Sequence, residues 1–190
     1  DREKLLNGPK EPTPQNLQYP VVSQLDLSAF NGAHTTMPLL DMPMAEFQKD
    51  KVGAKRDFVM IVNEQIQSEC LEARMMVFFV DITSETRPFS VSNFNVPESP
   101  GGYCSRGGRF GAHSSNENMP PMYDKRVAFI TWFNAGVRAL DIRDPYSPKE
   151  IGYYIPAISE KTDKRCVKTP EGERCKVAIQ SNNVEVDDRG

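Results

Sequence analysis

The apolar residues of this chain fall into short runs, several of them alternating with polar residues, and turn-forming residues separate the runs. Such runs are of strand length, and they lack the sustained 3.6-residue period of a helix. Strand-like segments cover residues 57–64, 75–83, 89–97, 126–133, 137–145 and 150–156. The chain also contains 15 Pro and 12 Gly, which punctuate short strands and break helices. The pattern predicts an all-β protein.

Two copies of one unit account for the order of these segments. The first unit, residues 32–97, opens with "GAHTT", and the second, residues 111–156, opens with "GAHSS". Asp81 and Asp141, in Val-Asp-Ile and Leu-Asp-Ile, lie 60 positions apart, whereas the two opening histidines lie 79 apart. The difference indicates an insertion in the first unit. Small antiparallel sheets repeated in this way are typical of propeller blades.

We therefore expect a β-propeller built of short antiparallel four-stranded blades. Residues 1–17 are predicted to be an extended arm or linker, and residues 18–190 the blades, with partial blades at residues 20–28 and 176–190. A ring needs about four to eight blades of roughly 40 residues each, so this chain would cover only part of the ring. A β-sandwich, which also uses many short strands, is the alternative.

Charge and hydropathy exclude two classes of partner. The chain has 23 basic and 26 acidic side chains, a net charge of −3, and no long basic tract for a nucleic-acid backbone. Its longest apolar stretch, residues 75–80, is far shorter than the roughly 20 residues of a membrane-spanning helix. We expect neither nucleic-acid binding nor a membrane span.

Four cysteines without a Cys-x-x-Cys spacing favour disulfides over a zinc ribbon. A Pro-Glu-Gly turn lies midway between Cys166 and Cys175, so these two are predicted to pair across a hairpin. Cys70 and Cys104 then form the second pair, or remain as buried free thiols. A bridge would indicate an oxidising compartment, extracellular or periplasmic. The chain begins at Asp1, which fits either a removed export signal or a start inside a longer gene.

The only two histidines, His34 and His113, occupy the same position of the repeated unit. In a propeller they would face the same end of the central channel, where imidazoles can bind a transition metal or exchange protons. Glu64 and Glu117 each follow an asparagine after a histidine and are the candidate carboxylate ligands. The structural alternative is that each histidine closes a blade turn by bonding to the backbone, with both carboxylates at the surface.

Two further residues are candidates for binding. Arg109 lies in the Gly-rich approach to His113, where backbone amides could come near a bound anion, and Asn116 follows the same histidine. Arg109 could instead stack on Phe110 or pair with an acidic side chain. The string lacks the Lys-Ser/Thr ending of a phosphate-binding loop, and no nucleophile motif of a covalent hydrolase is present.

The segment "GGRFGAHSSNEN … AFITWFNAGVRALDIRDPYSPKEIGYYIPA", followed by "NNVEVDDRG", resembles the LVIVD-repeat proteins, which are secreted bacterial and archaeal β-propellers. The strands "VFFVDI" and "VRALDI" match the repeat that names the family, and the likeness covers roughly residues 20–190. The resemblance implies an exported propeller and no settled reaction. More distantly, the chain is similar to the selenium-binding and methanethiol oxidase propellers, in which histidines near the axis hold copper.

These observations lead to two hypotheses about function. The first is a secreted binding or assembly module of an extracellular or periplasmic complex, whose partners are other protein chains or the remainder of its own propeller. Exposed loop aromatics and the insertion at residues 42–56 would contribute to such an interface. The second is a metal-dependent oxidoreductase, most plausibly with copper, whose site uses His34 and His113. The first is favoured because a third imidazole is missing.

Overall fold

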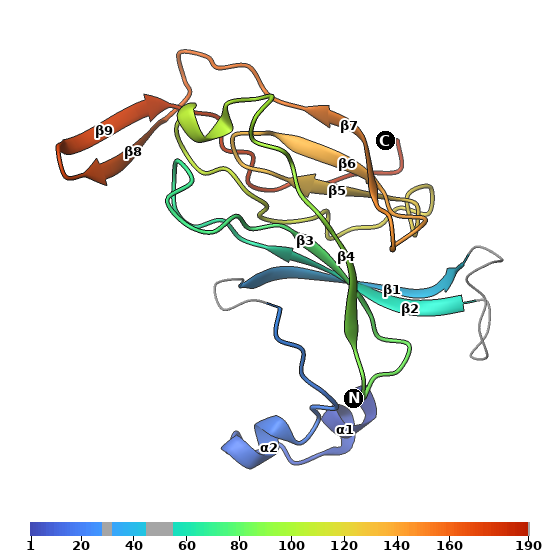
Figure 1. Cartoon of the computed structure of the whole chain (residues 1–190). Coiled ribbons are helices and arrows are strands. Elements are labelled where there is room, and N and C mark those ends of the chain that lie inside the picture. The colour runs from blue at the N-terminus through green and yellow to red at the C-terminus, as the bar shows by residue number, and fades with distance from the viewer. Residues whose placement is uncertain (28–31, 45–54, 190) are drawn as a thin grey trace.

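The computed structural model of the chain describes residues 1–27, 32–44 and 55–189, and its architecture is all-β (Figure 1). Two antiparallel sheets lie one above the other in this view, and a separate hairpin projects to one side. Within the described residues, neither sheet closes on itself. The all-β prediction is therefore confirmed.

The first sheet contains four strands in chain order, each antiparallel to the next. They are β1 (Ala33–Pro43), β2 (Lys55–Asn63), β3 (Val77–Asp81) and β4 (Phe89–Phe94). Successive side chains of a strand point to opposite faces. Along β2 the fully buried apolar side chains are Phe58, Met60 and Val62, separated by the partly exposed Val59 and Ile61, and the strand ends at the buried Asn63. Most of the predicted insertion at residues 42–56 lies outside the described residues.

The second sheet repeats this arrangement. Its strands are β5 (Val127–Thr131), β6 (Val137–Asp141) and β7 (Lys149–Tyr154). Residues 113–116 run antiparallel beside β5, where Ser115 pairs with Ile130 and the backbone N–H of His113 donates to the carbonyl of Thr131 at 3.0 Å. This short segment takes the place that β1 occupies in the first sheet.

The same irregularity occurs in both sheets at the same position. The register shifts between Phe79 and Val80 where β3 pairs with β4, and between Ala139 and Leu140 where β6 pairs with β7. These positions are 60 residues apart, which is the spacing read from the repeated Asp residues. The internal geometry of the two units is therefore repeated along with the sequence.

Strand register also relates the openings of the two units. When the β2–β3 and β5–β6 pairs are aligned, Ile61 and Ile130 occupy the same position. Ile61 faces Thr36 and Ile130 faces Ser115, and these partners are 79 residues apart. The two histidines, each two residues earlier in the chain, therefore lie at equivalent positions of the two units.

An apolar core joins the two units. The rings of Phe94, on β4, and Trp132 pack edge-to-face with their centroids 5.7 Å apart. The rings of Phe58, on β2, and Tyr146 pack in the same way with their centroids 5.8 Å apart. Such edge-to-face pairs stabilise packing beyond the burial of their area. Trp132 is completely buried. The contacts explain why the two sheets lie together in Figure 1.

The N-terminal region differs from the predicted extended arm. It contains two short helices, α1 (Arg2–Asn7) and α2 (Pro14–Gln18), neither of which buries a side chain. Asp1 caps the first helix through its carboxylate, and Thr13 caps the second ahead of a proline at its first turn. Local capping favours these turns even without apolar periodicity. Residues 21–27 form no strand, so the strand predicted at residues 20–28 is absent from its described part.

The hairpin consists of β8 (Lys164–Thr169) and β9 (Gly172–Val177), with its turn at Pro170 and Glu171. Cys166 and Cys175 are directly opposite in the ladder and form a disulfide. The second disulfide joins Cys70 to Cys104, which lies in a short 3-10 helix, η2 (Tyr103–Ser105). Both predicted pairings are confirmed. No helix among the described residues is both long and apolar enough to cross a membrane.

The Glu69 carboxylate ties the hairpin to the first unit. Its side chain is only 5% exposed and forms ion pairs with Arg174 and with Lys176, the latter at 3.3 Å. Burial raises the pKa of Glu69, but hydrogen bonds and charge from Arg174 and Lys176 together outweigh it, so the pKa lies below its ordinary value of 4.5. The carboxylate is thus ionised where it holds both cations of β9.

Candidate metal centre between the two units

The two histidines meet where the units adjoin. His34 lies at the start of β1 and is exposed, whereas His113 is 6% exposed on the segment beside β5. Their ring centroids are 4.3 Å apart with the planes inclined by 40°. The packing of the two sheets therefore brings together side chains that are 79 residues apart in the chain.

Glu64 completes a group of three possible ligands. It follows the last residue of β2, and its Oε1 lies 3.6 Å from Nε2 of His113. One donor atom from each of His34, Glu64 and His113 lies within 4.8 Å of the others. Ligands at about 2.0–2.2 Å from a tetrahedral ion are about 3.4 Å apart. Small side-chain rotations would therefore bring the three donors to the spacing of ligands around one ion.

Hydrogen bonds orient both imidazoles through Nδ1. In His113 this atom lies 2.5 Å from the carbonyl oxygen of Asn182, and in His34 it lies 3.0 Å from the hydroxyl of Thr35. A carbonyl oxygen only accepts, so Nδ1 of His113 donates this hydrogen bond, and in the neutral ring Nε2 is the nitrogen that offers a lone pair to a metal. Fixing one ring nitrogen in this way is what metal-binding histidines require.

The backbone carbonyl of Asn182 accepts hydrogen bonds from three side chains, a role that the sequence alone did not predict. Besides Nδ1 of His113, it accepts from the hydroxyls of Ser114 at 3.0 Å and Thr131 at 2.9 Å. The neighbouring Ser181 donates its N–H to the carbonyl of Phe133 and holds this strand-like segment against the second unit. A backbone acceptor leaves no signature in its own side chain, so no sequence signal points to it.

Arg109 balances the charge of Glu64. Its guanidinium donates to Oε1 of Glu64 at 3.0 Å and lies 5.0 Å from the ring centre of Phe133. The expected pairing of Arg109 with an acid is thus observed, while its aromatic neighbour is Phe133 rather than Phe110. A cation bound by Glu64 would share the carboxylate with Arg109, which weakens its attraction for that cation.

A hollow beside the group provides access from outside. Its volume is about 290 Å³, and its lining includes His34, Glu64, Ile66 and Met75. The exposed position of His34 places one imidazole at the mouth of this hollow. A ligand atom or a water molecule can therefore approach His34 and Glu64 directly, whereas His113 does not line the hollow.

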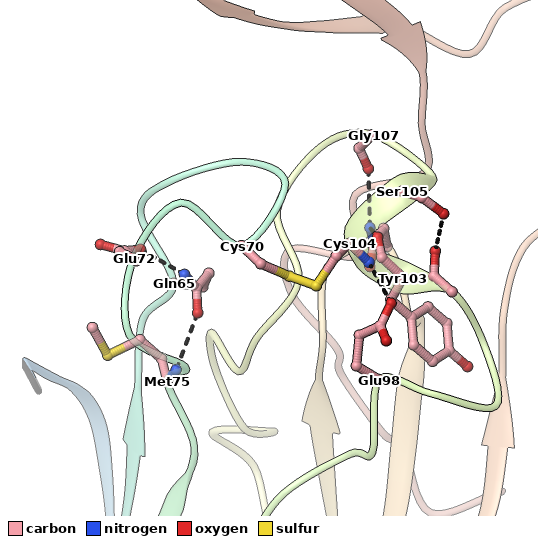
Figure 2. Close-up of a disulfide and its surroundings, with 11 residues drawn as sticks. Gln65, Cys70, Glu72, Met75, Glu98, Tyr103, Cys104, Ser105 and Gly107 are labelled. Atoms are coloured by element: carbon pink, nitrogen blue, oxygen red, sulfur yellow. Dashed lines mark hydrogen bonds between the residues drawn. A yellow bond between two sulfur atoms is a disulfide. The ribbon is translucent and has the colours of Figure 1, made fainter. Parts of the chain in front are cut away.

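The Cys70–Cys104 disulfide, shown in Figure 2, joins two loops that lead to residues of this site. Cys70 belongs to the loop after Glu64, and Cys104 to the segment that leads to Arg109. Gln65 braces the first loop, because its Nε2 donates to Glu72 at 2.8 Å and its Oε1 accepts from the N–H of Met75 at 3.0 Å. The covalent link therefore sets how close the two loops lie.

Two predicted site residues do not join the group. Glu117 is exposed and is not among the three possible ligands. Asn116 is fully buried and has a structural role: its Oδ1 accepts from the N–H of Phe129 at 2.9 Å, and its Nδ2 donates to the carbonyl of Asn118 at 2.7 Å. The chain turns outward after Asn116, which carries Glu117 away from His113 although the two are close in sequence.

A second group of possible ligands comprises Cys166, Glu173 and Cys175 on the hairpin. Both sulfur atoms are held in the disulfide, so this group offers no thiolate.

Comparisons of this chain with protein-family models, with curated proteins and with solved structures found no match. The resemblance to the LVIVD-repeat proteins therefore stays a prediction, and the functional argument rests on the geometry of the described residues.

Proposed function

We propose that this chain is a secreted repeat protein that holds a divalent transition metal between its two units. The observation that carries the proposal is the convergence of donor atoms from His34, Glu64 and His113 within 4.8 Å of one another. These side chains come from three separate segments, so their meeting is a product of the fold. The orientation of both imidazoles through Nδ1 supports the same conclusion.

The donor set suits a first-row transition metal. Two imidazole nitrogens and one carboxylate oxygen match the preferences of zinc, copper, iron and nickel, and copper is the metal that the distant propeller resemblance implies. Three protein ligands leave a position for water or a substrate, as at catalytic metal sites. An oxidoreductase activity is therefore compatible with the proposed centre, and metal binding is its necessary first test.

The test is elemental analysis of the protein after loading and exhaustive dialysis. Protein incubated with Cu²⁺ or Zn²⁺ is expected to keep about one equivalent, measured by plasma mass spectrometry. His34→Ala and Glu64→Gln should each lose most of it, whereas Glu117→Gln, an exposed carboxylate outside the group, should keep it. Among the described residues, the exposed side chain of His34 hydrogen-bonds to its neighbour Thr35 alone, so its variant is expected to fold, which circular dichroism checks. Equal metal content in all four proteins would refute the proposal.

We also propose that the two units are blades of a β-propeller. Their shared register, with the histidines on the first strand of each unit, supports this arrangement over a β-sandwich. Solution scattering of a longer form of the protein tests it: a ring gives the profile of a short, closed cylinder, and an elongated profile would contradict it.

A binding or assembly role is the second candidate function, and the last strand of the second unit favours it. Ile151, Tyr153 and Tyr154 on β7 are between 59% and 68% exposed, which is unusual for large apolar side chains on one strand. Other protein chains, or the remainder of the same propeller, are the partners we propose for this edge. Slower hydrogen exchange of the β7 amides in the assembled protein would support it, and unchanged exchange would refute it.

The two disulfides support an extracellular or periplasmic location. Trapping free thiols at the time of cell lysis tests this: four alkylated cysteines in freshly extracted protein would contradict the proposal.

A further inference from the structure

We propose that a groove beside the β8–β9 hairpin binds a small organic anion that carries two or more carboxylates on an apolar body. The groove has a volume of about 970 Å³ and lies between β8 and the loop at residues 66–71, with Arg109 and Asn182 in its lining. This volume is typical of small-molecule sites. The inference does not require a metal at the neighbouring group of His34, Glu64 and His113, although Arg109 of the groove pairs with Glu64 of that group.

The charge of the lining is one-sided. Its ionisable side chains are Arg109, Lys164, Arg165 and Lys168, and no acidic residue of the described chain lines the groove. The protein as a whole has a net charge of −3, so this concentration of positive charge is local. A cleft with charges of one sign raises the local concentration of counter-ions and attracts them from a distance.

Much of this positive charge lacks a partner in the protein. Lys164 and Lys168 make no ion pair with any described residue. Arg165 makes a single loose one among the described residues, in which its Nη2 lies 4.0 Å from Oδ2 of the exposed Asp163. Lys164 and Lys168 are four residues apart on β8, each two residues from Cys166, and alternate side chains of a strand point the same way, so both lysines lie on one face of β8. A ligand with several negative charges would meet both.

Arg109 sets the type of anion. Its guanidinium is fixed by Glu64 on one side and by the ring of Phe133 on the other. A planar guanidinium held in this way presents paired N–H donors to a carboxylate, whereas a lysine acts as a point charge. The amides of Gln180 and Asn182 supply further polar groups in the same lining.

One wall of the groove is apolar, which is why we expect the ligand to have an apolar body. Ile66 is 49% exposed and Leu71 is 63% exposed, and both line the groove together with the ring of Phe133. Exposed aliphatic side chains opposite a row of cations are arranged to cover a hydrocarbon or aromatic body while its charged groups reach the hairpin.

The walls of the groove are held in place before any ligand binds. The Cys166–Cys175 disulfide joins the hairpin strands, and Glu69 pairs with Lys176, whose Nζ also donates to the carbonyl of Ser105 at 2.8 Å. A preorganised site loses less conformational entropy on binding, which increases affinity.

The experiment is calorimetric titration of chelator-treated, metal-free protein with benzene-1,3,5-tricarboxylate. We expect saturable binding with one site, and none with benzamide, which has a similar body and no charge. The double variant Lys164→Gln/Lys168→Gln should bind about tenfold or more weakly, because charge-assisted contacts are lost. The matched control Lys149→Gln/Lys161→Gln removes the same charge from exposed positions outside the groove and should bind as the wild type does.

Three outcomes would overturn the inference. They are unchanged affinity in the groove variant, an equal loss in the control variant, and tighter binding of inorganic pyrophosphate than of the tricarboxylate, which would exclude the apolar carboxylate as the preferred ligand. Because the protein is free of metal, failure of this test leaves the proposed metal centre untouched. Loss of metal binding in His34→Ala, conversely, leaves the groove intact.

Discussion

Removing the Cys70–Cys104 disulfide is expected to damage both stability and the candidate metal centre. The bridge closes a segment with a sequence separation of 34 residues and joins the loop after Glu64 to the segment that leads to Arg109. Its loss frees the unfolded chain and loosens the spacing of the two loops. The double variant Cys70→Ser/Cys104→Ser should therefore lose stability and metal together.

The size of the stability effect follows from loop length. In the chain-entropy model, a loop of this length contributes about 3.8 kcal/mol, which corresponds to a fall in melting temperature of about 8–15 °C for a protein of this size. The Cys166–Cys175 bridge has a separation of only 9 residues, and the same model gives about 2.6 kcal/mol for it. Cys166→Ser/Cys175→Ser is thus the matched control.

The assay is urea unfolding followed by fluorescence of the single Trp132, with metal content measured on the same samples. The Cys70→Ser/Cys104→Ser variant should show the larger loss of unfolding free energy and a weakened affinity for Cu²⁺ or Zn²⁺. The hairpin variant should keep its metal, because no residue of the hairpin belongs to the three-ligand group. A larger stability loss in the hairpin variant, or full metal binding without the Cys70–Cys104 bridge, would refute the reasoning.

Three further predictions concern individual side chains. Gly136→Ala should lower the free energy of unfolding by at least about 1 kcal/mol, because Gly136 has a φ of +80° and an added Cβ would lie 2.1 Å from a backbone carbonyl oxygen. Gly152→Ala, with open space around the added Cβ, should be nearly neutral in the same thermal unfolding assay. Glu69→Gln should lower the unfolding free energy at neutral pH, and its difference from the wild type should shrink as the pH falls below 4.5 and the wild-type carboxylate is protonated, as a series of urea titrations would show. Asp81→Asn should cost about 3 kcal/mol in urea unfolding, since Asp81 is 1% exposed and pairs with Arg56 at 2.9 Å; a cost below about 1 kcal/mol would contradict that estimate.

The strands and the repeat were predictable because their causes are local. Alternating apolar residues in the sequence correspond to alternating buried positions in a strand, as at Phe58, Met60 and Val62. The Cys166–Cys175 pairing was also predictable, because the turn between the two cysteines lies midway between them. The N-terminal helices were missed because capping by Asp1 and Thr13 forms short helices without the apolar period that sequence reading relies on.

The site was predictable only in part. The shared motif position revealed His34 and His113 as a pair, since equivalent positions of packed repeats lie near one another. Glu117 was grouped with them from proximity in sequence, although the path of the backbone sends its side chain outward. The carbonyl of Asn182 and the ring of Phe133 reach His113 through long-range pairing, which one sequence without its fold does not reveal.

The equivalence of the two units also bears on how such a centre could arise. Duplication of an ancestral unit with one histidine at its opening supplies two converging imidazoles in a single event, since the copy inherits both the side chain and its place in the sheet. The acidic partner, by contrast, is not shared by the two units. In the alignment of β2 with β5, the position of Glu64 corresponds to Phe133 in the second unit. Glu64 and Phe133 both contact the Arg109 guanidinium, so divergence at this one position lets two copies of a unit contribute a carboxylate and an aromatic ring to the same candidate centre.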